Sequence, residues 1–548
     1  MEVSTNVLST RYKWQKAFED QDFVSSLTTD VLPAYLQKCR WFAAKASKIK
    51  QYRLENQIKI KGTGTEGLVY LLILEVIFAA GNSESYLVPV YFAPVKPSAV
   101  EEAAFITKAK VNGQNGVLME ATYLESYRNR LFKNISSRAK IKDDEGEVVF
   151  NRGRVLTRDK SVKRISSHLL GAEQSNTTIV YNDKYFLKIY RRLFIDPNPD
   201  YELTQFLSEG AGFKYSPQFA GSIHWKNKRL PEVTLGLMQY KVENQGEAWG
   251  YLLQQVRSFY QKIDEDKTLV NEIEEVPLNK PWSIKDLSET LTDLIGYDTL
   301  EKISKLGKRT AQMHISLASD KNNHSFAPIL FNEDYSVWLK NRLMIQFDFR
   351  YNLVELNLHK LQGLAYDYAL KFLDNKQFIQ QTIIGLDIIR LSSQRIRIHG
   401  DYHLGQVLIT DGDFCILDFE GEPECTIRDR KVKQSPLKDV AGMLRSFHYA
   451  VYATIFDKGS KSKLSLEDQF TAGEKYYQAI ISVYLNSYIK TAMDNALDIG
   501  YMPEINYLLR YHLLEKAVYE LGYELNSRPA WVIIPLKGIM QILETEKK

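Results

Sequence analysis

The chain has few cysteines and no long apolar run. Its 548 residues include three cysteines, Cys39, Cys415 and Cys425, and their number and spacing fit neither a disulfide framework nor a CxxC zinc site. The longest apolar stretch, residues 68–80, contains Glu75 and is shorter than the roughly 20 residues that cross a bilayer. These absences exclude a small disulfide-stapled domain and predict a protein with no membrane span.

Neither sign of charge dominates. The chain carries 71 Lys and Arg against 67 Asp and Glu, a formal net charge of +4, which gives no general attraction to nucleic acid or to an anionic membrane. Residues 1–15 have no apolar core of the kind found in secretory signals. Together with the low cysteine content, this predicts a reducing, cytoplasmic location and no nucleic-acid or membrane partner.

The pattern of apolar residues changes along the chain. Residues 1–95 read as a helix over 31–40 followed by antiparallel strands, and residues 96–243 read as further short strands. From residue 244 onward helical periodicity dominates, for example over 364–390 and 437–455. A β-rich first part followed by a mostly helical second part predicts an α+β chain with two lobes.

The segment most informative about chemistry is Arg397–Ile409 together with the hairpin that follows it. Asp401 and Asp418 stand at the ends of short strands, and Gln406 follows Asp401 by five residues. Phosphoryl transfer on the kinase plan needs such a set, in which one Asp accepts the proton of the attacking hydroxyl and an amide and a second Asp hold Mg²⁺. We therefore predict Asp401 as the catalytic residue and Gln406 and Asp418 as metal ligands.

A kinase also needs a lysine on a strand and a glutamate on the next helix. Lys188 lies in the second strand of a hairpin predicted over 177–190, and Glu202 lies in the first turn of a helix opened by Asn198 and Pro199. We predict that Lys188 contacts the phosphates of ATP and that Glu202 holds it.

Two further segments are predicted to contact the nucleotide. Residues 171–177 precede the hairpin and match no glycine-rich phosphate motif, so Ser175, Asn176 and backbone N–H groups would have to cradle the phosphates. Residues 235–242 form a strand that ends in polar residues, a pattern that suits a hinge where Gln239 and Val242 meet adenine.

Plainer interpretations of these residues remain open at this point. Asp401 and Asp418 taken singly are ordinary turn acids, and Lys188 taken singly is a surface lysine on a half-buried strand. His399 and His403, spaced i and i+4, resemble a metal pair, but no third ligand is evident, and a His399 that braces the loop is the favoured interpretation.

Several motifs, taken together, resemble bacterial maltokinase, which belongs to the aminoglycoside phosphotransferase and choline kinase branch of the protein-kinase-like fold. The segments that carry the resemblance are distributed almost end to end: Arg40–Phe42, Asn198–Glu202, Gln245–Trp249, Arg309–His314, His399–Gln406, Asp418–Pro423, Ser435–Phe447, Glu515–Leu525 and Arg528–Trp531. The family implies a bilobal protein-kinase-like fold with an N-terminal α/β cap subdomain over 1–95, a β-rich N-lobe piece with the nucleotide loop and hinge over 96–243, and a helical C-lobe over 244–548.

The resemblance also implies a function. It predicts ATP- and Mg²⁺-dependent phosphorylation of maltose at its anomeric hydroxyl, giving maltose 1-phosphate and ADP. It further implies a role in glycogen-like α-glucan synthesis from trehalose, with trehalose synthase as a functional partner.

The sugar is expected on the C-lobe beside Asp401. Glu420 follows Asp418 by two residues, and Arg430 belongs to a basic cluster that could neutralise the transferring phosphoryl group. A late helix carries one face of polar and aromatic residues predicted to contact the sugar: Lys516, Tyr519, Glu520, Tyr523 and Glu524. Without the resemblance, this face reads as an exposed salt-bridged surface. Asp439, in the helix after Ser435, is predicted to anchor the catalytic loop.

Two other functions stay open. The chain could phosphorylate another small substrate, glucosamine or an aminoglycoside. It could also be a catalytically idle kinase fold that binds nucleotide as a regulatory protein, although the intact set of Lys188, Glu202, Asp401, Gln406 and Asp418 argues against this.

Overall fold

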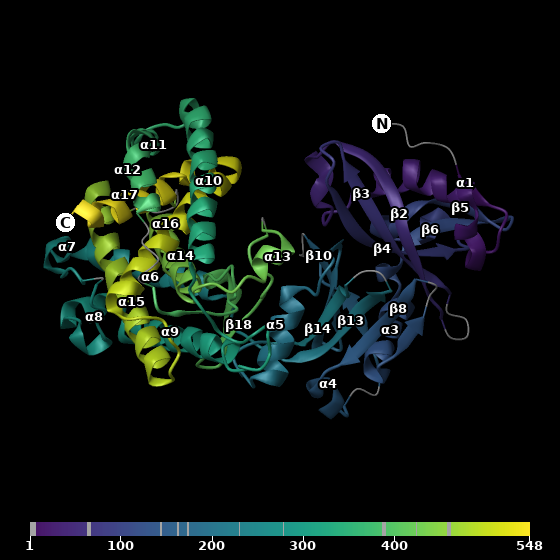
Figure 1. The fold of residues 1–548 in the computed structure, drawn as a ribbon, viewed down its shortest axis with the longest axis horizontal. Helices are drawn as coiled ribbons and strands as arrows, with labels where there is room; N and C mark the ends of the chain where they lie inside the picture. The colour runs from purple at the N-terminus through teal and green to yellow at the C-terminus, as the bar shows by residue number, and fades with distance from the viewer. Residues whose placement is uncertain are drawn as a thin grey trace. The chain divides into compact units, whose positions relative to one another are not determined.

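The computed structural model describes residues 7–62, 67–142, 145–161, 164–171, 175–228, 231–277, 279–385, 391–423, 425–457 and 462–547. The chain divides into two units, and each is described by itself. The first, β-rich unit comprises residues 1–205 and 217–241, and the second, helical unit comprises 206–216 and 242–548 (Figure 1).

The β-rich unit opens with a sheet whose strands follow the order β1-β5-β6-β4-β3-β2, and β12 also pairs with β4. These strands are β1 (Leu8–Thr10), β2 (Ile49–Ile60), β3 (Val69–Phe78), β4 (Ser83–Ala93), β5 (Phe105–Val111), β6 (Gln114–Glu120) and β12 (Arg192–Leu193). Because β5 and β6 complete this sheet, it continues past the domain boundary predicted at residue 95.

Short helices cover one face of this first sheet. They are α1 (Gln21–Ser26) and α2 (Leu32–Leu36), joined by a π-helical segment at Leu27–Val31. The helix predicted over 31–40 therefore begins earlier and ends at Leu36. Pro33 explains the irregularity, because a proline ring displaces the carbonyl four residues before it and a wider turn relieves that clash. Phe23, Leu27 and Leu32 pack against Tyr70 and Val88 of the sheet.

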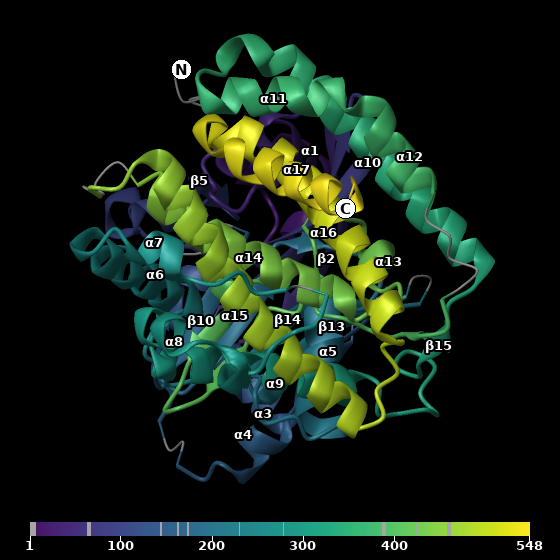
Figure 2. The ribbon, with the colours of Figure 1, turned by 90° about the vertical axis from the view of Figure 1, so that its left-hand side faces the viewer.

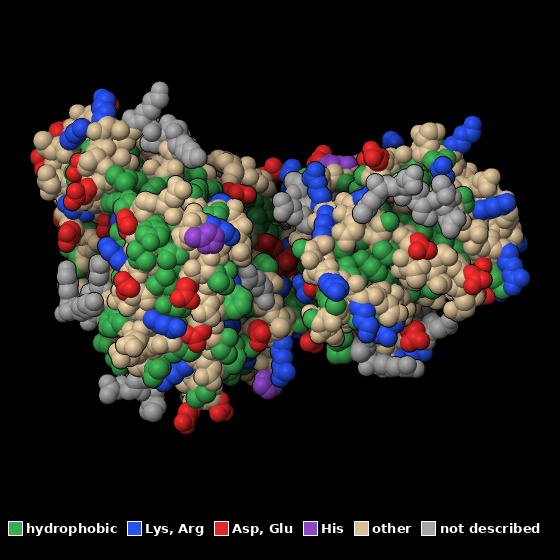
Figure 3. Space-filling model, turned by 90° about the horizontal axis from the view of Figure 1, so that it is seen from above, with side chains coloured by type: hydrophobic (Ala, Val, Ile, Leu, Met, Phe, Trp, Pro, Cys, Tyr) green, Lys and Arg blue, Asp and Glu red, His purple; other side chains and the backbone are tan. Residues whose placement is uncertain are grey.

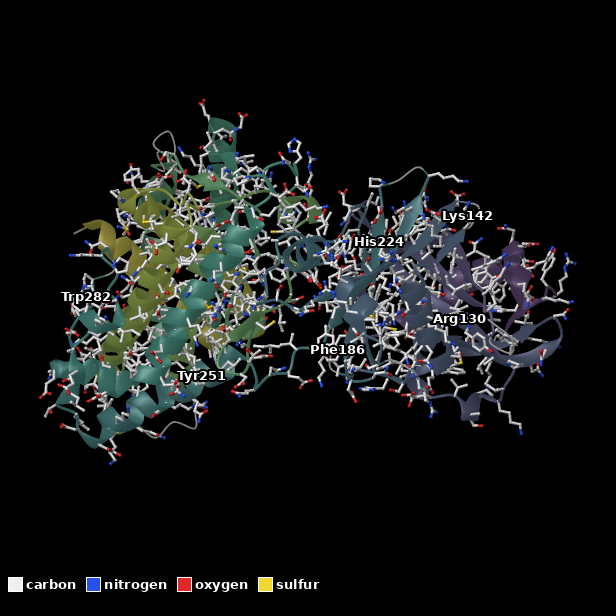
Figure 4. The ribbon with its side chains drawn as sticks, turned by 90° about the horizontal axis from the view of Figure 1, so that it is seen from below. Arg130, Lys142, Phe186, His224, Tyr251 and Trp282 are labelled. Carbon is white, nitrogen blue, oxygen red and sulfur yellow. The ribbon has the colours of Figure 1, made fainter. Side chains whose placement is uncertain are left out.

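A second sheet follows the order β7-β8-β13-β14-β11-β10-β9. Its strands are β7 (Lys140–Lys142), β8 (Gly146–Arg152), β9 (Ser167–Leu169), β10 (Asn176–Tyr181), β11 (Tyr185–Tyr190), β13 (Phe219–Asn227) and β14 (Val233–Tyr240). Helix α3 (Glu125–Ser137) packs on it through Phe132 and Ile135. Arg130 of α3, labelled in Figure 4, donates hydrogen bonds to the carbonyls of Ile60 and Gly67, which tie the helix to the first sheet.

The predicted hairpin is confirmed, since β10 and β11 pair in antiparallel register with Thr178 opposite Lys188. Its turn residues Asn182 and Asp183 both have φ of 52°. Two consecutive left-handed residues match the twist of the flanking strands, and Asn and Asp tolerate this backbone better than most residues. The short helix α4 (Arg154–Arg158) precedes the hairpin in the chain. Helix α5 (Pro199–Gln205), predicted from its Asn-Pro start, follows it.

The helical unit confirms the predicted change of pattern (Figures 1 and 2). Its main helices are α6 (Ala248–Glu265), α7 (Leu269–Glu272), α8 (Glu289–Ile295), α9 (Tyr297–Leu317), α10 (Glu333–Asn357), α11 (Leu364–Asp374), α12 (Lys376–Ile384), α13 (Ile427–Arg430), α14 (Leu437–Ile455), α15 (Leu466–Asp494), α16 (Met502–Ser527) and α17 (Ile533–Lys547). Its short strands are β15 (Ile329–Leu330), β16 (Gln394–Arg395), β17 (Val407–Ile409) and β18 (Phe414–Ile416).

One predicted helix is divided. The stretch expected to be helical over 364–390 forms α11 and α12, which meet at Asn375, and residues 386–390 lie outside the described part of the chain. At this junction the carbonyl of Lys371 accepts from both the backbone N–H and the side-chain amide of Asn375, so the side chain of Asn375 competes for a helical acceptor at the end of α11. Among the described residues, no helix is both long and apolar enough to cross a membrane.

Candidate active site

The predicted catalytic loop is held by a buried carboxylate from α14. Asp439 is 1% exposed and accepts hydrogen bonds from the backbone N–H groups of His399 at 2.7 Å and Gly400 at 2.9 Å. Its second partner is the ring of His314, at 3.0 Å. Burial opposes ionisation of Asp439, but the hydrogen bond and charge of His314 outweigh it, so its pKa lies below the usual carboxyl value. The predicted anchoring role of Asp439 is confirmed.

His399 braces the same loop from the inside. Its Nε2 lies 2.7 Å from the carbonyl oxygen of Leu417, so Nε2 carries the proton and donates. Nδ1 is then the acceptor for the backbone N–H of Asp401, at 3.4 Å. Since Leu417 directly precedes Asp418, one imidazole ring links the two segments that carry the predicted catalytic and metal-binding acids. The bracing interpretation of His399 is confirmed.

Two glycines allow the backbone to pass closely here. Gly400 has a φ of +87°, which favours glycine, and a Cβ at this position would lie 3.2 Å from Cα of Gly421. A Cβ on Gly442 of α14 would lie 2.6 Å from the carbonyl oxygen of Tyr402. The catalytic loop therefore rests directly on α14.

The two predicted metal ligands lie together. Nε2 of Gln406 is 3.2 Å from Oδ2 of Asp418, and Asp418 has a left-handed backbone with φ of +61° just after β18. This contact is a hydrogen bond donated by the amide nitrogen. The amide oxygen of Gln406 and the carboxylate of Asp418 are oxygen donors of the kind that a hard divalent cation such as Mg²⁺ prefers. The chemistry of the set thus fits the ion that the sequence motif implies.

Asp401 forms an ion pair with the late helix. Nζ of Lys516, on α16, lies 3.1 Å from Oδ1 of Asp401 and 3.5 Å from Oε1 of Glu422. Burial alone would raise the pKa of Asp401, but the Lys516 charge overrides it and holds this pKa below its usual value. The pKa of Lys516 is raised, because the attraction of Asp401 and Glu422 outweighs the cost of burying its charge.

The ion pair extends into a buried charge cluster. Glu515 of α16 lies 3.5 Å from Nζ of Lys438 and 3.9 Å from Nε of Arg342, and Arg342 also lies 3.4 Å from Glu422. The cluster therefore contains three carboxylates, Asp401, Glu422 and Glu515, and three cations, Lys516, Lys438 and Arg342. The charges in this set balance.

The remaining polar residues predicted on α16 have different partners. Glu520 bonds the buried guanidinium of Arg445 at 2.6 Å, and Glu524 bonds Arg528 at 2.7 Å. Both glutamates therefore form ion pairs. The interpretation of this face as an exposed surface does not hold for them, because both are buried. Tyr519 has its ring 4.9 Å from Nζ of Lys516, beside the cluster. Tyr523 is 51% exposed.

Arg430 supports the loop after β18. It donates hydrogen bonds to three backbone carbonyls, those of Cys425 at 3.0 Å, Pro423 at 2.9 Å and Glu420 at 3.3 Å. Its guanidinium thus shapes the segment that contains Glu420 and Glu422. The predicted contact of Arg430 with a phosphoryl group, and that of Glu420 with sugar, stay predictions.

In the β-rich unit, Lys188 faces an acid that the sequence analysis did not single out. Its Nζ lies 3.3 Å from Oδ2 of Asp200, and the hydroxyl of Tyr190 donates to the same oxygen at 3.0 Å. Asp200 is placed by the helix start, because its N–H donates to the side-chain oxygen of Asn198. Glu202 stands half-buried in the first turn of the same helix, as predicted.

The other predicted nucleotide residues are spread over the hairpin and the hinge. Ser175 is exposed and accepts from the amide of Asn176 at 3.2 Å, and residues 172–174 of the predicted phosphate loop lie outside the described residues. Gln239, on β14, donates to Thr204 at 3.1 Å. The division between the two units falls at Lys241 and Val242, within the segment predicted as the hinge.

Sequence reasoning missed four charged residues of these sites. Asp200, Glu422 and Lys438 lie inside segments that carry the resemblance, but their roles as charge partners were not predicted. Arg342 lies in none of these segments, and its partners Glu422 and Glu515 are distant in sequence. The one available signal was the acid at the second position of the Asn-Pro helix start, which places Asp200 where a lysine on the preceding strand can reach it.

Comparison with known structures defines the class of fold. The chain resembles a glucosamine kinase in complex with glucosamine, ADP and inorganic phosphate, with a TM-score of 0.61 and 16% identity over 93% of this chain and 98% of that one. A second crystal form of glucosamine kinase gives a TM-score of 0.62, also at 16% identity, over 93% and 97% of the two chains. The chain therefore has the bilobal fold of these kinases, as predicted.

A family model identifies the N-terminal part more closely. Residues 35–123 match the maltokinase N-terminal cap domain, which confirms the resemblance to bacterial maltokinase in this part of the chain. The match includes β5 and β6, the strands that complete the first sheet beyond residue 95.

Curated relatives match a shorter stretch. The glucosamine kinase of Streptacidiphilus jiangxiensis is 24% identical over 153 residues, which are 28% of this chain and 33% of that protein. The glucosamine kinase of Mycolicibacterium smegmatis (strain ATCC 700084 / mc(2)155) is 24% identical over 148 residues, 27% and 34% of the two chains. The matched stretch thus spans about a third of each of these curated relatives.

Proposed function

We propose that this chain is a sugar kinase that transfers the γ-phosphoryl group of ATP to the anomeric hydroxyl of maltose, giving maltose 1-phosphate and ADP. The observation that carries the proposal is the contact of Lys516 with Asp401, which joins the late helix to the catalytic loop of a kinase fold. The maltokinase-type cap over residues 35–123 supports maltose as the sugar.

Asp401 is proposed as the general base. Its pKa lies below the usual carboxyl value, so at neutral pH the carboxylate is ionised and is in the form that can accept a proton. The anomeric oxygen of the sugar attacks the γ-phosphorus, its proton passes to Asp401, and the bond from the γ-phosphorus to the bridging oxygen breaks to leave ADP. Asp439 and His399 keep the loop in place during this step.

Gln406 and Asp418 would hold Mg²⁺, which supplies positive charge against the phosphate oxygens when it is bound. In the β-rich unit, Lys188 would contact the phosphates, and Asp200 together with Glu202 would keep its ammonium group oriented. Ser175, Asn176, Gln239 and Val242 remain proposed as further contacts to ATP.

The charge of the cluster favours a neutral sugar over an amino sugar. Glucosamine is the second candidate, since the relatives that match this chain are glucosamine kinases. An ammonium substrate needs an uncompensated carboxylate, and Asp401, Glu422 and Glu515 already face Lys516, Arg342 and Lys438. A buried carboxylate without a partner is costly, but each of these three carboxylates already has a cation beside it. The cluster therefore leaves no charge for an ammonium group to neutralise, which supports the neutral sugar maltose.

The test is ADP release over a panel of maltose, glucosamine and an aminoglycoside, each with ATP and Mg²⁺. We expect turnover with maltose and a fall of about a hundredfold or more in Asp401→Asn, the scale of a lost general base. Asp411→Asn, which changes an exposed acid of the same hairpin, is the matched control and keeps wild-type activity. Turnover of glucosamine without maltose would reverse the ranking, and nucleotide binding without any transfer would favour a regulatory protein.

The product suggests a place for the reaction. Maltose 1-phosphate is an activated sugar that a glucan-forming enzyme can consume, and a maltose-supplying enzyme such as trehalose synthase would act before this one. The proposed route therefore leads from trehalose to an α-glucan of the glycogen type.

A further inference from the structure

Helix α10 exposes large apolar side chains on one face. Ile345 is 70% exposed, Phe349 is 65% exposed and Leu356 is 71% exposed. Single exposed apolar residues are common, but a row of them on one helix face marks a surface that binds something. In Figure 3, hydrophobic side chains gather between charged ones on the helical unit at the left.

This face is continuous with the candidate active site. With 100° per residue, Arg342, Ile345, Phe349 and Leu356 fall within about 60° around the helix. Arg342 is the residue that reaches Glu422 and Glu515 in the charge cluster. The apolar row therefore begins one turn beyond a residue of the site, and Phe349 lies about 10 Å further along the helix axis than Arg342.

Helix α16 forms the other side of this surface. The guanidinium of Arg350 on α10 lies 6.0 Å from the ring of Tyr519 and 5.6 Å from the ring of Phe349. It also packs where a side chain on Gly522 of α16 would otherwise stand, so the two helices approach closely there. Tyr519 in turn neighbours Lys516.

A stepwise path of contacts thus leads outward from the catalytic carboxylate. It passes from Asp401 to Lys516, from Lys516 to Tyr519, from Tyr519 to Arg350 and from Arg350 to Phe349. Aromatic rings alternate with hydrogen-bond donors along it. A pyranose chain has the matching chemistry, because its C–H faces pack on aromatic rings and its hydroxyls accept from lysine and arginine.

We propose that the α10 face formed by Ile345 and Phe349, together with Tyr519 and Tyr523 of α16, is an extended acceptor subsite. It binds the outer pyranose units of a linear glucose oligosaccharide whose reducing-end hydroxyl lies at Asp401. The inference rests on the proposed function, since it names the class of acceptor that the same site takes: glucans of two and more units.

The experiment compares maltotriose and maltose in wild type, Phe349→Ala and Val337→Ala. Val337 is a matched control, because it is 51% exposed on the same helix but lies about 140° around it from Arg342. Calorimetry measures maltotriose binding, and ADP release measures kcat/KM for both sugars. Phe349→Ala should weaken maltotriose binding about tenfold, the worth of one aromatic contact, and should lower the preference for maltotriose over maltose, while Val337→Ala keeps the wild-type ratio.

The outcomes separate the two proposals. If the wild type phosphorylates maltose and Phe349→Ala binds maltotriose as tightly as wild type, the extended subsite is wrong and the proposed function stands. If maltotriose binds through Phe349 but no sugar is phosphorylated, the subsite stands and the function fails. The wild type could instead bind no oligosaccharide and sediment as a dimer, with Phe349→Ala sedimenting as a monomer. That result would overturn the subsite and identify the α10 face as a protein interface.

Discussion

Nζ of Lys516 lies 3.1 Å from Oδ1 of Asp401, although the two residues are 115 positions apart in the chain. The sequence motifs predict Lys516 for the sugar site and Asp401 for the catalytic loop, on segments far apart in the chain. Their contact places the positive charge of Lys516 directly against the proposed base. It also places α16, with its tyrosines, beside the position where the acceptor hydroxyl would lie.

Replacing Lys516 by Gln should change the pH dependence of the reaction. Lys516 lowers the pKa of Asp401, so removing its charge raises that pKa, by about one to three pH units on the scale of a lost opposite charge. The acid limb of kcat/KM should therefore move to higher pH. Lys516→Arg keeps the charge and should keep the limb near its wild-type position. An unchanged limb in Lys516→Gln would mean that another group controls it.

Replacing Gln406 by Ala should weaken the binding of Mg²⁺ at Asp418. The amide lies 3.2 Å from that carboxylate, and loss of one metal-site group typically costs about tenfold or more in metal affinity. The Mg²⁺ concentration that gives half-maximal ADP release should rise accordingly. Gln406→Glu restores an oxygen donor of the same length and should reverse the rise. If Gln406→Ala has the wild-type Mg²⁺ dependence, the amide is not part of the metal site.

Replacing Asp439 by Asn should destabilise the catalytic loop. The Asn amide group would face the N–H groups of His399 or Gly400 and leave a buried donor unpaired, at a cost of about 1–3 kcal/mol. The folded-state pKa of Asp439 is depressed, so its contribution to stability is present above about pH 4 and is lost as the pH falls through the folded value. Urea unfolding at pH 7 and pH 5 should show the full difference in free energy of unfolding between the wild type and Asp439→Asn. This difference should become smaller only in stronger acid.

Asp429→Asn provides the control for this experiment. Asp429 is half-buried in the short helix α13, where its side chain accepts from Thr426. Its substitution should change the free energy of unfolding by about 1 kcal/mol or less. A loss in Asp429→Asn equal to that in Asp439→Asn would contradict the anchoring role.

Replacing Arg191 by Met should strongly destabilise the β-rich unit. Arg191 is 1% exposed, lies 2.9 Å from Glu120 of the first sheet, and donates to Thr177 of the second sheet at 2.8 Å. Its loss leaves Glu120 buried without its partner, which typically costs about 3–5 kcal/mol. Arg192→Met is the neighbouring control, because its pair with Glu84 is partly exposed, with the arginine side chain 41% exposed, and is worth about 1 kcal/mol or less. Denaturant unfolding measures the loss of unfolding free energy in each variant. Equal losses in Arg191→Met and Arg192→Met would contradict the prediction that the buried pair contributes more to stability.

Local signals in the sequence sufficed for much of the architecture. The hairpin of β10 and β11 follows from β-rich runs on either side of Asn182 and Asp183, and α5 follows from its Asn-Pro start. Helix α14 has the predicted bounds. Where Pro33 or Asn375 interrupts a helix, the periodic pattern continues through the break, and periodicity alone therefore missed both interruptions.

The sequence by itself determined the residues that carry the proposed chemistry, since Asp401, Gln406 and Asp418 are fixed by their spacing on one loop and one hairpin. Only the tertiary structure decided which charges neutralise one another. Lys516 pairs with Asp401, Glu520 with Arg445, and Lys188 with Asp200. The physical reason is that spacing along a chain fixes local geometry, whereas an ion pair depends on which helices and strands pack together.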